Sequence, residues 1–155
     1  MKVYLKNPQA TEKFGHLIGQ LLQSGDVVCL TGDLGAGKTL LCKGLATARG
    51  VDAMAITSPT FTIMNIYDGD TNIRHFDFYR LQSEEELDDI GFDEYCGGSG
   101  ITVIEWAEQF VERLPSEYLQ ISIRRDREGR SAELVAKGQH YSEVIETLKN
   151  VYTGN

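Results

Sequence analysis

Apolar residues recur along several segments of the chain with the period of an amphipathic helix. Residues 10–24 carry a stripe at the spacing i, i+3, i+4, i+7 and i+8, formed by Phe14, Leu17, Ile18, Leu21 and Leu22. The segment 139–152 has a similar stripe, and 38–49 is predicted to be a helix that Gly50 ends. A Ser-x-x-Glu capping box at 83–86 opens one more short helix.

Other segments have the patterns of β-strands. Two continuous apolar runs, 26–30 and 101–104, are typical of strands buried on both faces. Segments rich in branched and aromatic or alternating residues come in pairs separated by turn residues, which predicts two hairpins: 60–67 with 72–80, and 118–125 with 130–137. Strands and helices in this order predict an α/β fold, with a mixed, mostly parallel sheet, helices on both faces and antiparallel hairpins.

Length and composition indicate one ordinary globular domain. The chain has 155 residues, with 41% hydrophobic and 25% charged residues, and no linker or repeat divides it. No apolar run approaches the ~20 residues that span a bilayer, so we expect no membrane association. Residues 1–6 are too short and too charged to form a signal peptide, and the expected compartment is the cytoplasm.

Charge and cysteine content exclude several functions. The net charge of −8 argues against nucleic-acid binding by this chain alone, because such binding depends on neutralising phosphates. A role involving RNA would therefore need a partner to contact the RNA. The three cysteines contain no Cys-x-x-Cys pair, so neither a zinc site nor a disulfide framework is indicated. Cys29 and Cys42 lie among apolar residues and are predicted to be buried in the core.

One segment matches the G-x-x-x-x-G-K-[ST] pattern of a phosphate-binding P-loop. It consists of Gly32, Asp33, Leu34, Gly35, Ala36, Gly37, Lys38 and Thr39. Glycines let backbone N–H groups surround phosphates, and the following helix adds its N-terminal partial charge. Lys38 can reach the β- and γ-phosphates, and the Thr39 hydroxyl can bind Mg²⁺. Because a buried strand precedes the loop and a helix follows it, we predict a single P-loop NTPase domain over 1–155 that binds ATP, rather than a glycine-rich turn without a ligand.

An acidic residue follows a second buried strand. P-loop sites use an acidic side chain near a strand end to orient Mg²⁺. Glu105 comes directly after 101–104 and takes this place, although Asp is the usual residue. Ligands lie at strand carboxyl ends in such sheets, which favours a functional role over a surface position. Trp106 comes next, and it either lines the site or packs in the core.

Two further segments contain candidate residues. Alternation along 74–80 places Phe76 and Phe78 on one face of a strand, opposite a row formed by His75, Asp77 and Tyr79. We favour Asp77 as the group that positions an attacking or metal-bound water, while a solvated strand face is the alternative for the row. Thr60 lies in a hydroxyl-rich segment beside a proline, which forms either a switch that senses the γ-phosphate or an ordinary turn.

Taken together, these motifs resemble one family. They are the Gln-Ala-Thr helix start at 9–11, the P-loop, and the segments 58–61, 75–81, 91–95 and 104–106. In this order, and over nearly the whole length, the chain resembles the TsaE family, the ATPase component of bacterial tRNA N6-threonylcarbamoyladenosine biosynthesis. The P-loop alone is shared by very many proteins, whereas this combination in so short a chain is specific.

The resemblance implies a function and a set of site residues. It implies a cytoplasmic protein that binds ATP and Mg²⁺ and works with two larger proteins of the actin-like ATPase superfamily. Those partners carry out threonylcarbamoyl transfer to adenosine 37 of tRNAs reading codons that start with A, and ATP hydrolysis resets the complex between turnovers. By position, Thr39 and Glu105 correspond to Mg²⁺ ligands, Lys38 to the phosphate clamp, and Asp77 and Thr60 to catalytic or switch residues. The remaining correspondence places Thr11 and Arg130 beside the nucleotide.

Two other functions stay open at this point. A small-molecule kinase also uses a P-loop, but no obvious lid segment follows the first hairpin. A non-hydrolysing adaptor would use ATP only to shape a docking surface, and Asp77 and Glu105 argue against it. A GTPase is disfavoured because no Asn-Lys-x-Asp or Thr-Lys-x-Asp tetrapeptide occurs. The sequence assigns no activating arginine, although Arg80 is a possibility, so we expect hydrolysis to be slow without partners.

Overall fold

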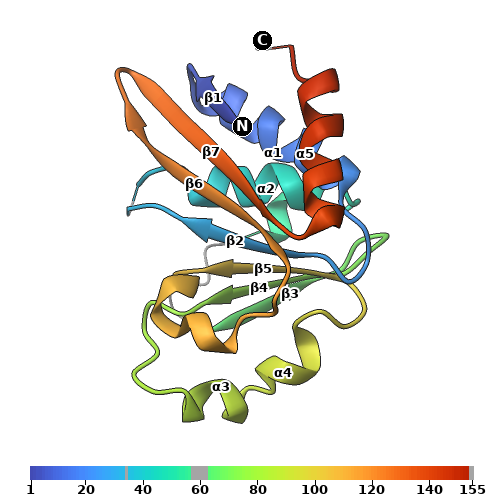
Figure 1. The fold of residues 1–155 in the computed structure, drawn as a ribbon, viewed down its shortest axis with the longest axis vertical. Coiled ribbons are helices and arrows are strands. Elements are labelled where there is room, and N and C mark those ends of the chain that lie inside the picture. Colours follow the sequence, from blue (N-terminus) through green and yellow to red (C-terminus); the bar gives the residue numbers. More distant parts are fainter. Residues whose placement is uncertain (34, 57–62, 154–155) are drawn as a thin grey trace.

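The computed structural model describes residues 1–33, 35–56 and 63–153, which form an α/β fold (Figure 1). Its sheet has seven strands in the order β1-β7-β6-β2-β5-β4-β3. Along the chain the strands are β1 (Lys2–Leu5), β2 (Val27–Thr31), β3 (Met64–Tyr67), β4 (Ile73–Asp77), β5 (Ile101–Glu105), β6 (Tyr118–Asp126) and β7 (Gly129–Lys137). The neighbouring strands β6, β2, β5 and β4 run parallel, whereas β7, β1 and β3 pair antiparallel at the two sides. The mixed sheet with antiparallel hairpins is therefore confirmed.

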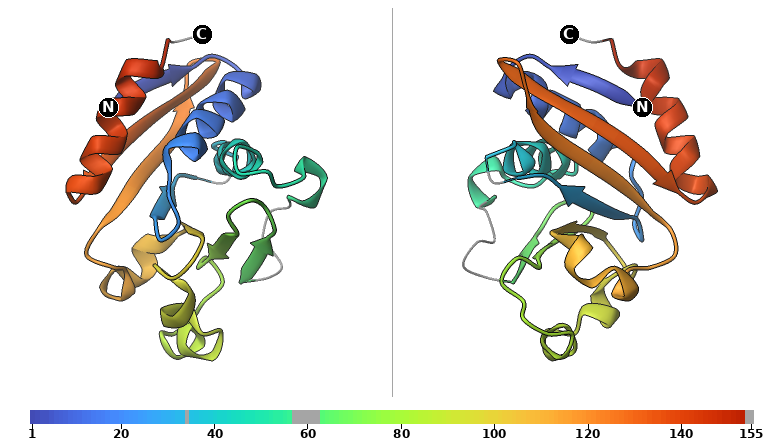
Figure 2. Two further views of the ribbon diagram at one scale, coloured as in Figure 1. Left: turned by 90° about the vertical axis from the view of Figure 1, so that its right-hand side faces the viewer. Right: turned by 60° about the vertical axis from the view of Figure 1, so that its left-hand side comes forward.

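Helices cover both faces of this sheet, but to different extents. They are α1 (Pro8–Leu21), α2 (Lys38–Thr47), α3 (Glu85–Asp89), α4 (Phe92–Tyr95) and α5 (Gln139–Val151), with the 3₁₀ segments η1 (Ala53–Ala55) and η3 (Ala107–Arg113). Figure 2 shows α1, α2 and α5 together on one face, where they enclose the larger apolar core. On the other face, α3, α4 and η3 enclose a second core built around Phe76, Phe78 and Phe92.

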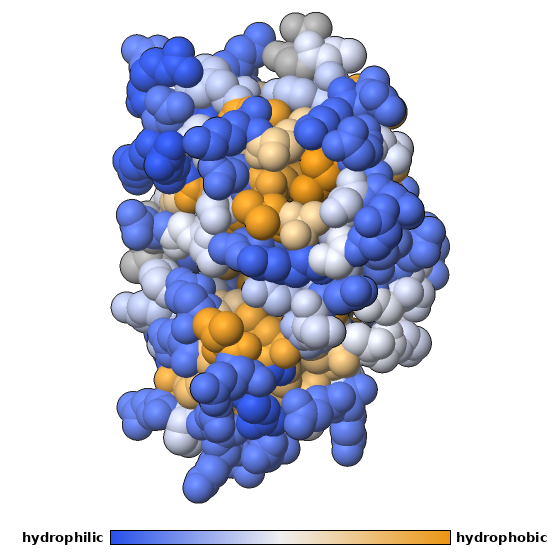
Figure 3. Space-filling view, viewed as in Figure 1, coloured by the Kyte–Doolittle hydropathy of each residue, from blue (hydrophilic) through white to orange (hydrophobic). Residues whose placement is uncertain are grey.

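The burial of each strand follows from this arrangement. All five residues of β5 and the first four of β2 are buried, because helices lie on both sides of the sheet centre. In β6, by contrast, Leu119, Ile121 and Ile123 are buried, and the residues between them are at least partly exposed. One face of β1, β7 and β6 is thus open to solvent. On the side seen in Figure 1, polar side chains surround two areas of apolar surface (Figure 3).

The helix that follows the P-loop is held by an unusually close contact with α1. A Cβ on Gly15 would overlap the backbone carbonyl of Leu41 in α2, and one on Gly44 would overlap that of Glu12 in α1. Only glycine permits this approach of the two backbones. Asn7 begins α1 by accepting a hydrogen bond from the Ala10 backbone N–H through Oδ1 at 2.8 Å. The contacts of Gly15 and Gly44 hold α2, which begins at the P-loop, against α1.

One local prediction was wrong. The capping box at 83–86 does not form: α3 begins at Glu85, and its N-cap residue Glu84 makes no side-chain capping bond. The Glu86 carboxylate instead accepts a hydrogen bond from the Gln82 backbone N–H at 2.8 Å. Because the helix starts later than the pattern placed it, the Glu86 side chain reaches back past Ser83.

No helix in the described part of the chain is long and apolar enough to cross a membrane.

Candidate functional site

The P-loop connects the carboxyl end of β2 to the amino end of α2. Gly37 is the N-cap of α2 and has φ 112°, a left-handed conformation that favours glycine. Lys38 is the first helical residue and is 6% exposed, while Thr39 beside it is exposed. Free N–H groups and the helix dipole make such a start suitable for an anion. The strand–loop–helix context that the sequence predicted is therefore confirmed.

A cavity of about 500 Å³ opens at this end of the sheet. The P-loop and α2 contribute Gly35, Gly37, Lys38, Thr39 and Leu40 to its wall. The rest of the wall comes from the amino end of α1, the ends of β4 and β5 and the β6–β7 turn, through Asn7, Pro8, Thr11, Asp77, Tyr79, Arg80, Glu105, Trp106, Glu128, Gly129 and Arg130. Most of the residues predicted as a site from distant parts of the sequence thus meet in one place.

Glu105 and Lys38 form a buried ion pair in this cavity. The Glu105 carboxylate is at the end of β5, and its Oε1 lies 3.8 Å from the Lys38 Nζ; both side chains are 6% exposed. Burial alone would raise the pKa of Glu105, but the hydrogen bond from His75 and the charges of His75 and Lys38 lower it below its ordinary value. The carboxylate is therefore held ionised at the strand end.

His75 lies within the protein next to the site, on the strand face that the alternating pattern gave it. It is 1% exposed and lies beneath α2, so the solvated-face alternative is wrong for this residue. Its Nε2 lies 2.6 Å from Glu105 Oε2, and its Nδ1 lies 3.6 Å from Cys42 Sγ. Burial lowers the pKa of His75, but its contacts with Cys42 and Glu105 outweigh burial and raise it well above the ordinary value. The opposite shifts of His75 and Glu105 are those expected of a buried ion pair.

Asp77 and Trp106 line the cavity beside this pair. Asp77 is paired with Glu105 in the parallel register of β4 and β5, and its Oδ1 accepts from the Tyr79 backbone N–H at 2.9 Å. Partial burial raises the pKa of Asp77, and the nearby Glu105 charge adds to the shift. The Trp106 ring centroid lies 4.3 Å from the Lys38 Nζ. Of the two alternatives for Trp106, the structure therefore supports a position in the site wall, although the ring also packs against the second core.

Arg130 reaches the P-loop from β7, which β6 separates from β2 in the sheet. Its Nε donates to the Ala36 carbonyl at 2.9 Å and its Nη2 donates to the Gly35 carbonyl at 3.1 Å. The Arg130 guanidinium therefore holds the loop backbone while it lines the cavity. Thr11 is 1% exposed, and its hydroxyl donates to the Asn7 carbonyl at 3.5 Å. Both residues line the cavity at its α1 and β7 side, and their place beside the nucleotide stays a prediction.

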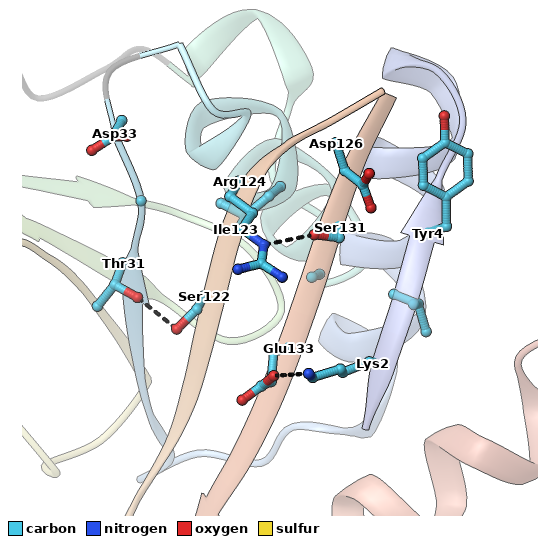
Figure 4. Close-up of a pocket in the computed structure, with 13 residues that line it drawn as sticks. Lys2, Tyr4, Thr31, Asp33, Ser122, Ile123, Arg124, Asp126, Ser131 and Glu133 are labelled. Carbon is cyan, nitrogen blue, oxygen red and sulfur yellow. Dashed lines mark hydrogen bonds and ion pairs between the residues drawn. The ribbon is translucent and has the colours of Figure 1, made fainter. Parts of the chain in front are cut away.

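Four predicted site residues do not line this cavity or lie outside the described residues. Asp33 lines a second cavity, of about 550 Å³, on the open face of β1, β7, β6 and β2 (Figure 4). Its position in the P-loop pattern does not bring its side chain into the first cavity, because successive side chains of the loop point in different directions. Ala36 is 1% exposed and offers its backbone to Arg130. Leu34 and Thr60 lie outside the described residues.

Two contacts were missed by the sequence reasoning. Cys42 was predicted only as a core residue, yet it contacts the imidazole that binds Glu105. It follows Lys38 by four residues on a helix, a spacing that puts both side chains on one helical face and could have suggested a shared environment. The hydrogen bonds of Arg130 to backbone carbonyls leave no sequence signal, because any residue can supply a carbonyl.

Comparison with known proteins agrees with this geometry. The family model described as "Threonylcarbamoyl adenosine biosynthesis protein TsaE" matches residues 5–132. The chain belongs to the TsaE family. The match includes the P-loop, Asp77, Glu105 and Arg130, so it covers the cavity described above.

Similar proteins support the same assignment. A TsaE protein of Treponema pallidum is 44% identical over 124 residues, which cover 80% of this chain and 91% of that protein. The TsaE protein of Bacillus subtilis is 42% identical over 144 residues, covering 92% of this chain and 89% of its own length. The crystal structure of Bacillus subtilis YdiB superposes with a TM-score of 0.80 at 36% identity and covers 97% of this chain and 94% of that one. The α/β fold is therefore that of a solved structure.

Proposed function

We propose that this protein is the ATP-binding and ATP-hydrolysing component of the machinery that forms N6-threonylcarbamoyladenosine in tRNA. The observation that carries the proposal is the convergence of two buried charges, Lys38 and Glu105, on one cavity at the carboxyl ends of β2 and β5. Isolated charges are expensive to bury, so such a pair at a cavity indicates a functional site. The TsaE names of the relatives supply the pathway.

The chain offers ATP a binding site made of backbone and side-chain groups. The loop ending at Gly37 and the start of α2 present N–H groups to the phosphates, and Lys38 supplies the cation that reaches the β- and γ-phosphates. Arg130 keeps the loop in place through the Gly35 and Ala36 carbonyls. Thr11 and Trp106 line the same cavity, and we expect them to lie beside the nucleoside.

The residues present fit Mg²⁺. This ion prefers oxygen ligands such as hydroxyls and carboxylates. The Thr39 hydroxyl and the Glu105 carboxylate line the same cavity, and Glu105 is ionised because its pKa is lowered by His75 and Lys38. These two residues would hold the ion, as the sequence predicted. When bound, Mg²⁺ neutralises charge that develops on the transferring phosphoryl group.

Asp77 is the residue proposed to position the attacking water. It lies at the end of β4, next to Glu105 across the strand pair, and it lines the cavity. Its raised pKa, caused by partial burial and the neighbouring carboxylate, makes it a better proton acceptor than an exposed aspartate. Thr60 remains a proposed switch residue.

The proposed partners are two larger proteins of the actin-like ATPase superfamily, with tRNA held by them. The net charge of −8 agrees with indirect contact with tRNA. Arg80 and Arg130 line the cavity, and Arg130 is engaged with the P-loop backbone. Hydrolysis is therefore expected to be slow in the isolated chain and to rise when partners complete the site, since a well-placed arginine accelerates phosphoryl transfer by about 10³–10⁵.

The test is ATP hydrolysis with Mg²⁺ by the purified chain, alone and with the two partners and tRNA. We expect slow turnover that rises with the partners and is strongly reduced in Lys38→Ala and Glu105→Ala. Binding without hydrolysis under every condition would indicate an adaptor instead. Phosphate transferred to a small metabolite would indicate a kinase. An isolated chain as fast as the complete mixture would contradict the expected stimulation.

A further inference from the structure

His75 connects three elements of the site without lining the cavity. It belongs to β4, contacts Cys42 of α2 through Nδ1 and contacts Glu105 of β5 through Nε2. The imidazole is almost completely buried. An ionised carboxylate can only accept hydrogen bonds, so Nε2 must carry a proton and donate a hydrogen bond to Glu105. The contact is therefore a directional hydrogen bond of 2.6 Å between buried groups.

Because of this hydrogen bond, the two oxygens of the Glu105 carboxylate have different partners. Oε2 is bound by His75 Nε2, whereas Oε1 is the oxygen nearest to Lys38 Nζ, at 3.8 Å. A carboxylate anchored through one oxygen cannot rotate freely about its terminal bond. The contact of His75 with Oε2 therefore determines that Oε1 is the oxygen facing Lys38.

The contact with Cys42 in turn restricts the orientation of the His75 imidazole ring. Cys42 is buried, and its Sγ lies 3.6 Å from His75 Nδ1. Since Lys38 and Cys42 are four residues apart on α2, the same helical face carries the phosphate-binding cation and the group that orients the imidazole. The P-loop helix and the strand-end carboxylate are therefore linked through one side chain.

We propose that His75 is a positioning residue that fixes the Glu105 carboxylate with Oε1 toward the phosphate and Mg²⁺ end of the cavity, and that Cys42 steadies its ring. This inference rests on the proposed function, because Glu105 acts on ATP and Mg²⁺ there. Outer partners of metal-binding side chains commonly matter in this way, and their loss costs about 10–100-fold in metal affinity or activity. A purely structural histidine would affect folding but not the dependence on Mg²⁺.

The test compares two substitutions at His75. His75→Phe keeps an aromatic ring of similar size but removes the N–H donor, whereas His75→Gln retains an N–H donor. His140→Phe is the matched control, because the His140 Nε2 also contacts a buried carboxylate, that of Asp26, at 3.0 Å. Asp26 precedes β2, so this second pair lies at the opposite end of the strand from the P-loop.

Trp106 provides a readout that does not require turnover. It is the chain's single tryptophan, and its ring lies 4.3 Å from the Lys38 Nζ, so its fluorescence should report ATP binding. The measurement is an ATP titration of each variant at a series of Mg²⁺ concentrations, together with kcat and KM for hydrolysis. Thermal melts identify any variant that does not fold.

We expect His75→Phe to bind ATP normally without Mg²⁺ but to need about 10–100-fold more Mg²⁺ for its half-maximal effect, with a similar loss in kcat rather than in KM. His75→Gln should recover most of this loss, and His140→Phe should match the wild type. An unchanged Mg²⁺ requirement in His75→Phe, or equal defects in His75→Phe and His75→Gln, would overturn the proposal.

Three further outcomes can be told apart. If His75→Phe does not fold, Cys42→Ala carries the test: a raised Mg²⁺ requirement supports the proposal, and an unchanged one overturns it. If the wild type shows no response to ATP at any Mg²⁺ concentration, the proposed function itself fails. A wild type that responds normally beside an unaffected His75→Phe rejects only the role of His75.

Discussion

The cavity at the P-loop and the cavity on the open sheet face are similar in size, but they differ in how their charges are placed. The cavity at the P-loop measures about 500 Å³ and the one on the open sheet face about 550 Å³. In the first, Lys38 and Glu105 are each 6% exposed. In the second, Lys2 and Glu133 form an ion pair at 3.2 Å with 74% and 47% of their side chains exposed (Figure 4).

The contrast shows why cavity size does not identify a site. Exposed pairs such as Lys2–Glu133 remain hydrated, contribute about 0–1 kcal/mol and are common on any surface. Buried charges lose hydration and persist only when other groups compensate them. Around Glu105, both Lys38 and His75 provide that compensation. The buried charges, which cost hydration free energy, are those at the carboxyl ends of the parallel strands, where ligands of such sheets bind.

The largest effect is expected from removing the cation of the buried pair. In Lys38→Ala, ATP hydrolysis in the presence of the partners should fall by about 10²–10³-fold, because a preorganised charge facing the phosphates is lost. The measurement is phosphate release under saturating Mg²⁺. Lys2→Ala, which removes the lysine of the second cavity, is the matched control and should hydrolyse ATP at the wild-type rate. Equal loss in both variants would remove the distinction between the cavities.

A somewhat smaller effect is expected at Asp77. Asp77→Asn keeps the size of the side chain and removes its proton-accepting capacity, so kcat should fall by about 10²-fold while KM changes little. Steady-state kinetics measure both quantities. A rise in KM without a change in kcat would show that Asp77 contributes to binding and does not position the attacking water.

A moderate effect is expected at Arg130, which connects the β6–β7 hairpin to the P-loop. Arg130→Ala removes two charge-assisted hydrogen bonds to the Gly35 and Ala36 carbonyls, so the affinity for ATP should fall about tenfold or more. Calorimetric titration gives the affinity. Arg124→Ala is the matched control, because Arg124 lies on the open face and donates to Ser131 instead. It should leave the affinity unchanged.

The smallest effect is expected from the exposed pair. Glu133→Gln should change the free energy of unfolding by about 1 kcal/mol or less, since the pair is hydrated and screened by salt. Denaturant unfolding at low and high salt measures this value. A much larger loss of unfolding free energy would mean that this ion pair stabilises the fold more than its exposure indicates.

The helices and strands could be predicted well from the sequence because each depends on a local pattern of apolar and polar residues. The stripe of α1, the apolar runs of β2 and β5 and the alternation of β6 and β7 each report how much of an element is covered. The P-loop pattern likewise places Lys38 and Thr39 in a fixed local context. Periodicity does not reveal which strands become neighbours, and the strand order follows from packing across the whole sheet.

The side chains that tune the site were harder to predict. For the row that contains His75, alternation left a functional face and a solvated face open, and only the contact with Cys42 of α2 shows that His75 is buried. Asp33 belongs to the P-loop pattern and yet faces the second cavity. Both difficulties arise because a pattern gives the direction of a side chain relative to its own element. What covers that direction depends on contacts that are distant in sequence.

The most direct test of the account is a calorimetric titration of ATP with Mg²⁺ into the wild type, Lys38→Ala and Lys2→Ala. We predict one ATP bound per wild-type chain, unchanged binding in Lys2→Ala, and binding in Lys38→Ala that is weakened by about 10²-fold or lost. Wild-type binding that persists at full affinity in Lys38→Ala, or that disappears in Lys2→Ala, would contradict the conclusion that the buried charges mark the nucleotide site.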